Sequence, residues 1–157
     1  MKLKFEIKVK TEFDKKELSN FVWKTEGRLT PSLSSRINVD EFIDRVHQNA
    51  TFFIARDTEN DTIVALNIVY VNKAPERSYA TFLAVLEEYE SMGIGARLIL
   101  NAIRYSKKEG SACYSLSMRK SNEIMLAFYL KNGFIIEDEK TYPNSNEIQV
   151  DLKLNFL

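Results

Sequence analysis

Two glycines after an apolar stretch form the first pattern in this chain of 157 residues that could do chemistry. Gly93 and Gly95 lie between the apolar run 79–86 and a helical pattern that follows them. A strand, a loop and a helix in this order leave backbone N–H groups pointing at an incoming anion, which the helix dipole also favours. Glycine has no Cβ, so the backbone can approach a phosphate closely. The pattern therefore predicts an anion-binding loop, although a tight turn also selects small residues. It lacks the third glycine of a dinucleotide-binding loop and the Lys-Ser/Thr of a P-loop.

A second pattern begins at Asn122 and continues through Tyr129 to Gly133 and Phe134. Its amphipathic spacing predicts a helix that ends at the glycine. Asparagine is a common helix N-cap and the tyrosine could be a core aromatic, so each residue has a purely structural interpretation. The spacing of seven residues combined with Gly-Phe favours a functional role for both.

Together the two patterns resemble the GNAT superfamily of acyl-CoA-dependent N-acetyltransferases. The coenzyme loop of that family reads Ala-Val-x-Pro-x-Tyr-Arg-Gly-x-Gly-Ile-Gly, and residues 84–95 read Ala-Val-Leu-Glu-Glu-Tyr-Glu-Ser-Met-Gly-Ile-Gly. The later family helix reads Asn-x-x-Ala-x-x-x-Tyr-x-x-x-Gly-Phe, and this chain matches it with Met125 in the alanine position. Both motifs lie in residues 79–136, about one third of the chain.

The resemblance implies transfer of an acetyl group from acetyl-CoA to a primary amine by direct attack, without a metal ion. It assigns Tyr129 as the general acid that protonates the departing thiolate. It assigns the backbone N–H of Val85 as the donor to the oxyanion, and the amide of Asn122 as a contact of the pantetheine arm. The full set of coenzyme-binding residues that it implies is Leu83, Ala84, Val85, Ser91, Met92, Gly93, Ile94, Gly95, Ala96, Asn122 and Tyr129.

The chain departs from the family pattern at three loop positions. Glu87 replaces the usual proline, and Glu90 and Ser91 replace Arg or Gln followed by Gly. A carboxylate at Glu90 would repel the coenzyme if it pointed inward, and Arg97 in the first turn of the following helix could offset it. Backbone N–H groups from Met92 onward could still bind a diphosphate.

The acceptor is expected against the first two helices and the segment between them. Arg28, Ser32 and Arg36 belong to a polar, cationic stretch there, which could bind a polyol, a carboxylate or a phosphate or could be an ordinary loop. We therefore expect a small polar amine, with an amino sugar as the leading candidate. No general base can be assigned, and an acceptor on a protein, either the N-terminus or a lysine, is the alternative.

Periodicity along the chain predicts the elements that must position these residues. Alternating apolar and charged residues predict a strand over 1–10, and strand-like apolar stretches predict strands over 51–55, 62–71, 79–86, 113–118, 134–138 and 147–155. Helices are expected after Asp14 and Asn38, each followed three residues later by Glu as in a capping box, and over 93–108 and 121–131. The order β-α-α-β-β-β-α-β-α-β-β predicts an α/β (α+β, three-layer) fold: a GNAT-like mixed central sheet of about six or seven strands flanked by about four helices.

Length and composition set the remaining limits. Residues 1–157 suit a single domain, and 45% hydrophobic and 28% charged residues are ordinary for a globular protein. A net charge of zero does not favour a nucleic-acid or membrane partner. One cysteine and one histidine cannot form a zinc site, and no secretion signal is recognised, so a cytoplasmic protein is expected. The C-terminal segment 147–157 is long and apolar enough to pair with a second copy in a homodimer.

Two other classes of protein compete with the enzyme. A regulatory domain could keep the fold and bind acyl-CoA without turnover, and Glu90 and Ser91 are the residues that favour it. An interaction protein with this fold would bind no CoA at all.

Overall fold

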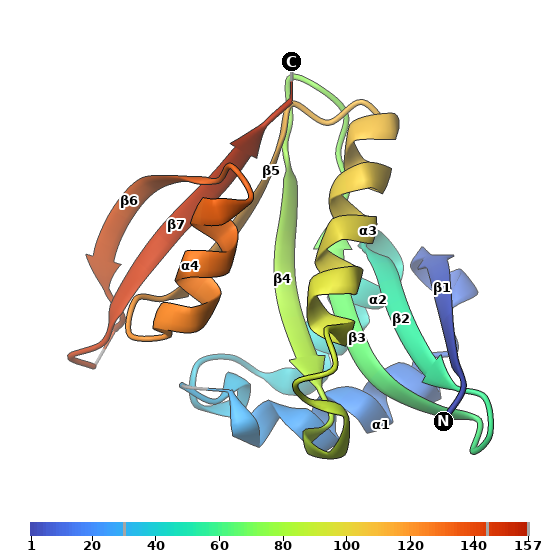
Figure 1. Cartoon of the computed structure of the whole chain (residues 1–157). Helices are drawn as coiled ribbons and strands as arrows, with labels where there is room; N and C mark the ends of the chain where they lie inside the picture. Colours follow the sequence, from blue (N-terminus) through green and yellow to red (C-terminus); the bar gives the residue numbers. More distant parts are fainter. Residues whose placement is uncertain (30, 144, 157) are drawn as a thin grey trace. The chain divides into compact units, whose positions relative to one another are not determined.

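The computed structural model describes residues 1–29, 31–143 and 145–156. Within these residues the chain forms seven strands and four α-helices (Figure 1). Their bounds are β1 (Leu3–Val9), α1 (Lys15–Thr25), α2 (Val39–Asn49), β2 (Thr51–Asp57), β3 (Thr62–Tyr70), β4 (Ser78–Val85), α3 (Ile94–Lys108), β5 (Cys113–Arg119), α4 (Glu123–Lys131), β6 (Ile135–Thr141) and β7 (Ile148–Asn155). The order is the predicted one, and the mixed sheet with flanking helices confirms the predicted fold class.

The contacts divide the chain into two compact units that share β4 and α3. The first unit holds residues 1–70 and 82–104, and the second holds residues 71–81 and 105–157. Hydrogen-bonded strands follow the order β1-β2-β3-β4-β5-β7-β6. β4 therefore contributes its C-terminal half to the first unit and its N-terminal half to the second.

The first unit consists of antiparallel strands with a helical layer on each face. β1 pairs with β2 and β2 with β3, and adjacent residues along each strand alternate between the two faces. On one face Phe52 packs against Phe13, which precedes α1, and Phe82 of β4 packs against Phe42 of α2. On the other face Phe5 lies under Arg97 of α3. Figure 1 shows α3 in front of these strands and α1 and α2 behind them.

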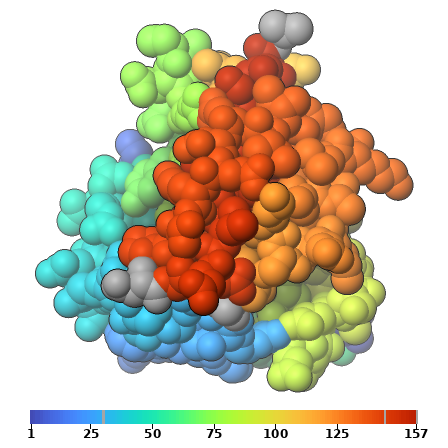
Figure 2. Space-filling view, turned by 90° about the vertical axis from the view of Figure 1, so that its left-hand side faces the viewer, coloured from blue at the N-terminus to red at the C-terminus, as the bar shows by residue number. Residues whose placement is uncertain are grey.

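The second unit is built on β5, β7 and β6. β5 runs parallel to β4 over Ser78–Ala80, and β7 is antiparallel to both β5 and β6. Its core contains Tyr114, Phe134 and Leu152, whereas all residues of β6 are exposed. Figure 2 shows the surface that β6 and β7 form, in orange to red.

The two predicted capping pairs have different outcomes. Asn38 accepts a hydrogen bond from the backbone N–H of Glu41 at 3.0 Å, as predicted. Asp14 is the N-cap residue of α1, so the helix begins where predicted, but its side chain makes no capping hydrogen bond and the predicted capping box does not form. Glu17 instead binds the guanidinium of Arg56, because a partly buried arginine needs carboxylate partners more than the helix end needs a second cap.

Candidate active site

The end of β4 presents one backbone N–H away from the neighbouring strand. Leu86, just beyond β4, donates its N–H to the carbonyl of Val64 on β3 at 2.8 Å. Successive N–H groups of an extended chain point to opposite edges, so the N–H and the carbonyl of Val85 point away from β3. That carbonyl accepts a hydrogen bond from Nη1 of Arg28 at 2.8 Å. The role of this N–H as the oxyanion donor remains a prediction.

The loop after β4 makes two turns through the left-handed region before α3 begins at Ile94. Ser91 has φ of 63° and Gly93 has φ of 76°. At Gly93 nothing lies within 4 Å of an added Cβ, so the position favours glycine for its backbone conformation alone. At Gly95 an added Cβ would lie 3.5 Å from Cγ2 of Val85, an ordinary contact. The helix start therefore packs directly against the end of β4.

This loop fits a diphosphate through its backbone. The N–H groups of Ile94, Gly95 and Ala96 belong to the first turn of α3, where no intrahelical acceptor is available. Met92 and Gly93 are exposed, and Met92 has 53% of its surface accessible. Unpartnered N–H groups and the positive end of the helix dipole together favour an anion at this point.

The charge at Glu90 is compensated, but not by the residue that the sequence suggested. Arg28 donates from Nη2 to the carboxylate of Glu90. Arg97 lies instead over the ring of Phe5, with its guanidinium carbon 4.3 Å from the ring centre. The cation beside the loop therefore comes from Arg28, 62 residues away along the chain.

A tyrosine–carboxylate hydrogen bond anchors the middle of the same loop. The hydroxyl of Tyr89 donates to Oδ2 of Asp57 at 2.9 Å. This bond holds the pKa of Asp57 below its ordinary value, helped by the backbone N–H groups of Glu59 and Lys2, and it raises the pKa of Tyr89. Asp57 is a residue that sequence reasoning missed, because no local signal connects it to a tyrosine 32 positions later.

The second unit holds Tyr129 among aromatic rings. Tyr129 is 5% exposed and its ring centre lies 5.0 Å from Phe134 and 5.5 Å from Phe128. Burial raises the pKa of its phenol, helped by Tyr114, so the group stays protonated at neutral pH. No hydrogen-bond partner of its hydroxyl is found among the described residues, and its role as a proton donor remains a prediction.

Asn122 has the structural role that the sequence left open. It is the N-cap of α4, and its Oδ1 accepts from the N–H of Met125 at 3.3 Å. The capping bond uses the oxygen, so the Nδ2 group remains available as a donor. A contact with the pantetheine arm remains a prediction.

The three residues expected at the acceptor are placed differently from one another. Arg28 ends a short 3-10 helix, Glu26–Arg28, and contacts the loop after β4. The carbonyl of Ser32 accepts from the hydroxyl of Ser35 at 2.7 Å, which closes a local turn. Arg36 is exposed and forms no ion pair with the described residues. Of the three, only Arg28 lies at the end of β4.

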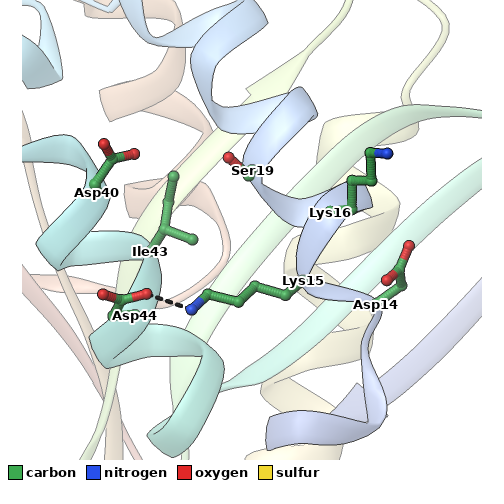
Figure 3. Close-up of a pocket in the computed structure, with 7 residues that line it drawn as sticks. All are labelled: Asp14, Lys15, Lys16, Ser19, Asp40, Ile43 and Asp44. Atoms are coloured by element: carbon green, nitrogen blue, oxygen red, sulfur yellow. Dashed lines mark ion pairs between the residues drawn. The ribbon is translucent and has the colours of Figure 1, made fainter.

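A groove lies between α1 and α2, on the helices where the acceptor was expected (Figure 3). Its walls carry Lys15 and Ser19 from α1 and Asp40, Ile43 and Asp44 from α2, and Lys15 pairs with Asp44. The groove runs along α1 from Lys15 toward Trp23, whose indole N–H donates to Asp40, and none of its lining residues belongs to β4 or to the loop after it. We therefore do not assign the groove to acetyl transfer.

The residues that the structure describes contain no cluster of three or more His, Cys, Asp or Glu side chains able to hold a metal ion. They also contain no helix with the length and apolar character needed to cross a membrane.

The model of the acetyltransferase (GNAT) family matches residues 13–134. The chain belongs to this family. The matched segment includes the first two helices, the loop after β4, and the helix that carries Asn122 and Tyr129. No curated protein matches the sequence.

Solved structures show the same fold at low sequence identity. The ribosomal-protein-S18-alanine N-acetyltransferase of Escherichia coli is 19% identical, covers 97% of this chain and 94% of its own, and has a TM-score of 0.75. A Bacillus subtilis acetyltransferase in complex with CoA is 21% identical, covers 99% of this chain and 100% of its own, and has a TM-score of 0.71. A GNAT acetyltransferase of Elizabethkingia anophelis with acetyl-CoA bound is 19% identical, covers 98% of each chain, and scores 0.71.

Proposed function

We propose that residues 1–157 form one N-acetyltransferase domain, which moves an acetyl group from acetyl-CoA to the primary amine of a small polar acceptor. The observation that carries the proposal is the end of β4 with its loop. Val85 directs its N–H away from β3, Gly95 packs on Val85, and the exposed residues Ser91 and Gly93 turn the chain into the start of α3.

Two residues of the chain have defined tasks in this proposal. The N–H of Val85 donates to the thioester oxygen, whose negative charge grows as the amine attacks. Tyr129 supplies a proton to the sulfur that leaves, since its phenol is kept protonated by burial. The coenzyme supplies the activated acetyl group, and the first-turn N–H groups of α3 bind its diphosphate.

The acceptor is proposed from the polar segment that follows α1. Ser32 and Arg36 lie there with polar groups at the surface, which suits a small hydroxylated amine. A protein N-terminus is the second candidate, because the structurally similar Escherichia coli enzyme acts on an alanine of a ribosomal protein.

The test combines coenzyme binding with a panel of amines. Acetyl-CoA is titrated into the purified protein by calorimetry, and release of free CoA thiol is then followed with amino sugars, simple polyamines and peptides with a free N-terminus. Micromolar binding, lost in Gly95→Arg, with thiol release for one acceptor class supports the proposal and names the acceptor. Binding without turnover on any amine would indicate an acyl-CoA-binding regulatory domain, and no binding at all would overturn the proposal.

A further inference from the structure

Arg28 joins two parts of the first unit that are far apart in sequence. Its Nη1 donates to the carbonyl of Val85 at 2.8 Å, and its Nη2 donates to the carboxylate of Glu90. One guanidinium therefore holds both the last residue of β4 and the start of the turn that leads to α3. Arg28 itself comes from the segment between α1 and α2.

The contact between Arg28 and Glu90 also changes the charge of the loop. Glu90 immediately precedes Ser91, the first of the two left-handed residues, and its side chain is 48% exposed. A free carboxylate at this place would face an arriving diphosphate with a charge of the same sign. Because Arg28 pairs with Glu90, the loop presents neutral peptide N–H groups in place of a local negative charge.

The ion pair between Arg28 and Glu90 differs from an ordinary surface ion pair because it lies beside a loop that is proposed to bind an anion. Exposed ion pairs contribute little to stability, so a pair of this kind is expected to matter mainly where a third charge arrives beside it. Here the third charge is the ligand. Both the backbone bond to Val85 and the pairing with Glu90 keep the loop in the conformation and charge state that an anion needs.

We propose that Arg28 is a positioning residue for coenzyme binding: it neutralises Glu90 and fixes the end of β4, so that the loop accepts the diphosphate of acetyl-CoA. The inference rests on the proposed function, because it takes the loop as the coenzyme site. It also assigns Arg28 to the coenzyme side of the reaction, whereas the sequence placed it with the acceptor.

The experiment separates the charge of Arg28 from its hydrogen bond. Arg28→Gln removes the charge but keeps an N–H donor for the carbonyl of Val85. Glu90→Gln removes the carboxylate, and the double variant removes both charges. Lys24→Gln is the matched control, since it removes one positive charge from the exposed last turn of α1. Circular dichroism and thermal unfolding confirm that each variant is folded.

Each variant is titrated by calorimetry with acetyl-CoA and with acetyl-pantetheine, which has the thioester but no phosphate. Arg28→Gln is expected to raise the Kd of acetyl-CoA about tenfold at low salt, with a smaller change at high salt. The Kd of acetyl-pantetheine should change less than about twofold, because no ligand phosphate meets the carboxylate. The double variant should bind acetyl-CoA within about threefold of the unaltered protein.

Each result either supports the inference or overturns it. Weaker binding of acetyl-CoA alone, with rescue by Glu90→Gln, supports it. An unchanged Kd in Arg28→Gln, or an equal loss for both ligands without rescue, overturns it while the proposed function stands. If the unaltered protein does not bind acetyl-CoA, the proposed function fails and the inference fails with it.

Discussion

Replacing Tyr129 with phenylalanine removes one oxygen and leaves the aromatic contacts in place. The ring keeps Phe134 at 5.0 Å and Phe128 at 5.5 Å, and no hydrogen bond to a described residue is lost. The free energy of unfolding should therefore change by less than about 1 kcal/mol. If the phenol protonates the leaving thiolate, kcat should fall about 100-fold, which corresponds to about 2.7 kcal/mol in the activation free energy.

The assay follows release of CoA thiol under saturating acetyl-CoA, together with calorimetric titration of the coenzyme. The Kd of acetyl-CoA should stay within about twofold, because the lost group acts on the departing sulfur and not on the bound coenzyme. Tyr70→Phe is a matched control, since it removes a phenol hydroxyl from the last residue of β3. A kcat equal to that of the unaltered protein would refute the assignment of Tyr129 as the acid.

The dependence of kcat on pH gives a second check of the same residue. Burial raises the pKa of Tyr129 above its ordinary value near 10, so the protonated form that donates persists through neutral and moderately alkaline pH. Ionisation of Tyr129 should therefore cause no loss of kcat below about pH 10. A decline centred near pH 8 that disappears in Tyr129→Phe would contradict the effect of burial.

Three further changes test the loop. Gly93→Ala places a side chain at φ of 76° and should lower the free energy of unfolding by about 1–2 kcal/mol in urea, whereas Gly27→Ala, at an ordinary φ, should not. Ser91→Gly removes the strain of a left-handed serine but increases the conformational entropy of the unfolded chain. The free energy of unfolding, measured by thermal unfolding, should therefore rise by at most about 1 kcal/mol, and a clear decrease would contradict strain at Ser91. Tyr89→Phe should move acid unfolding to higher pH by circular dichroism. Because the pKa of Asp57 is lowered in the folded state, its carboxylate stabilises the fold above the ordinary carboxyl pKa of about 4, and this stabilisation is lost as the pH falls further. An unchanged midpoint of acid unfolding would contradict a stabilising hydrogen bond between Tyr89 and Asp57.

Sequence patterns predicted the local structure well because local structure depends on near neighbours. The apolar runs of β2 and β3, the spacing of apolar residues in α3, and glycines with positive φ after α3 and α4 are all patterns within a few residues. The cap at Asn38 was predictable for the same reason. The capping box at Asp14 does not form, and the Glu17 side chain that it would use pairs with Arg56, 39 residues away.

In the candidate site, too, the features that depend on consecutive residues were predictable and those that depend on distant residues were not. The sequence alone identified the loop with Gly93 and Gly95 and the helix with Tyr129, because backbone turns and helix periodicity depend on residues that are close together in the chain. The tertiary structure alone decided that Arg28 compensates Glu90, that Asp57 anchors Tyr89, and that the N–H of Val85 points away from β3. Each of these features depends on which strands and segments the fold brings together. A hydrogen bond between residues tens of positions apart produces no periodic pattern in the sequence.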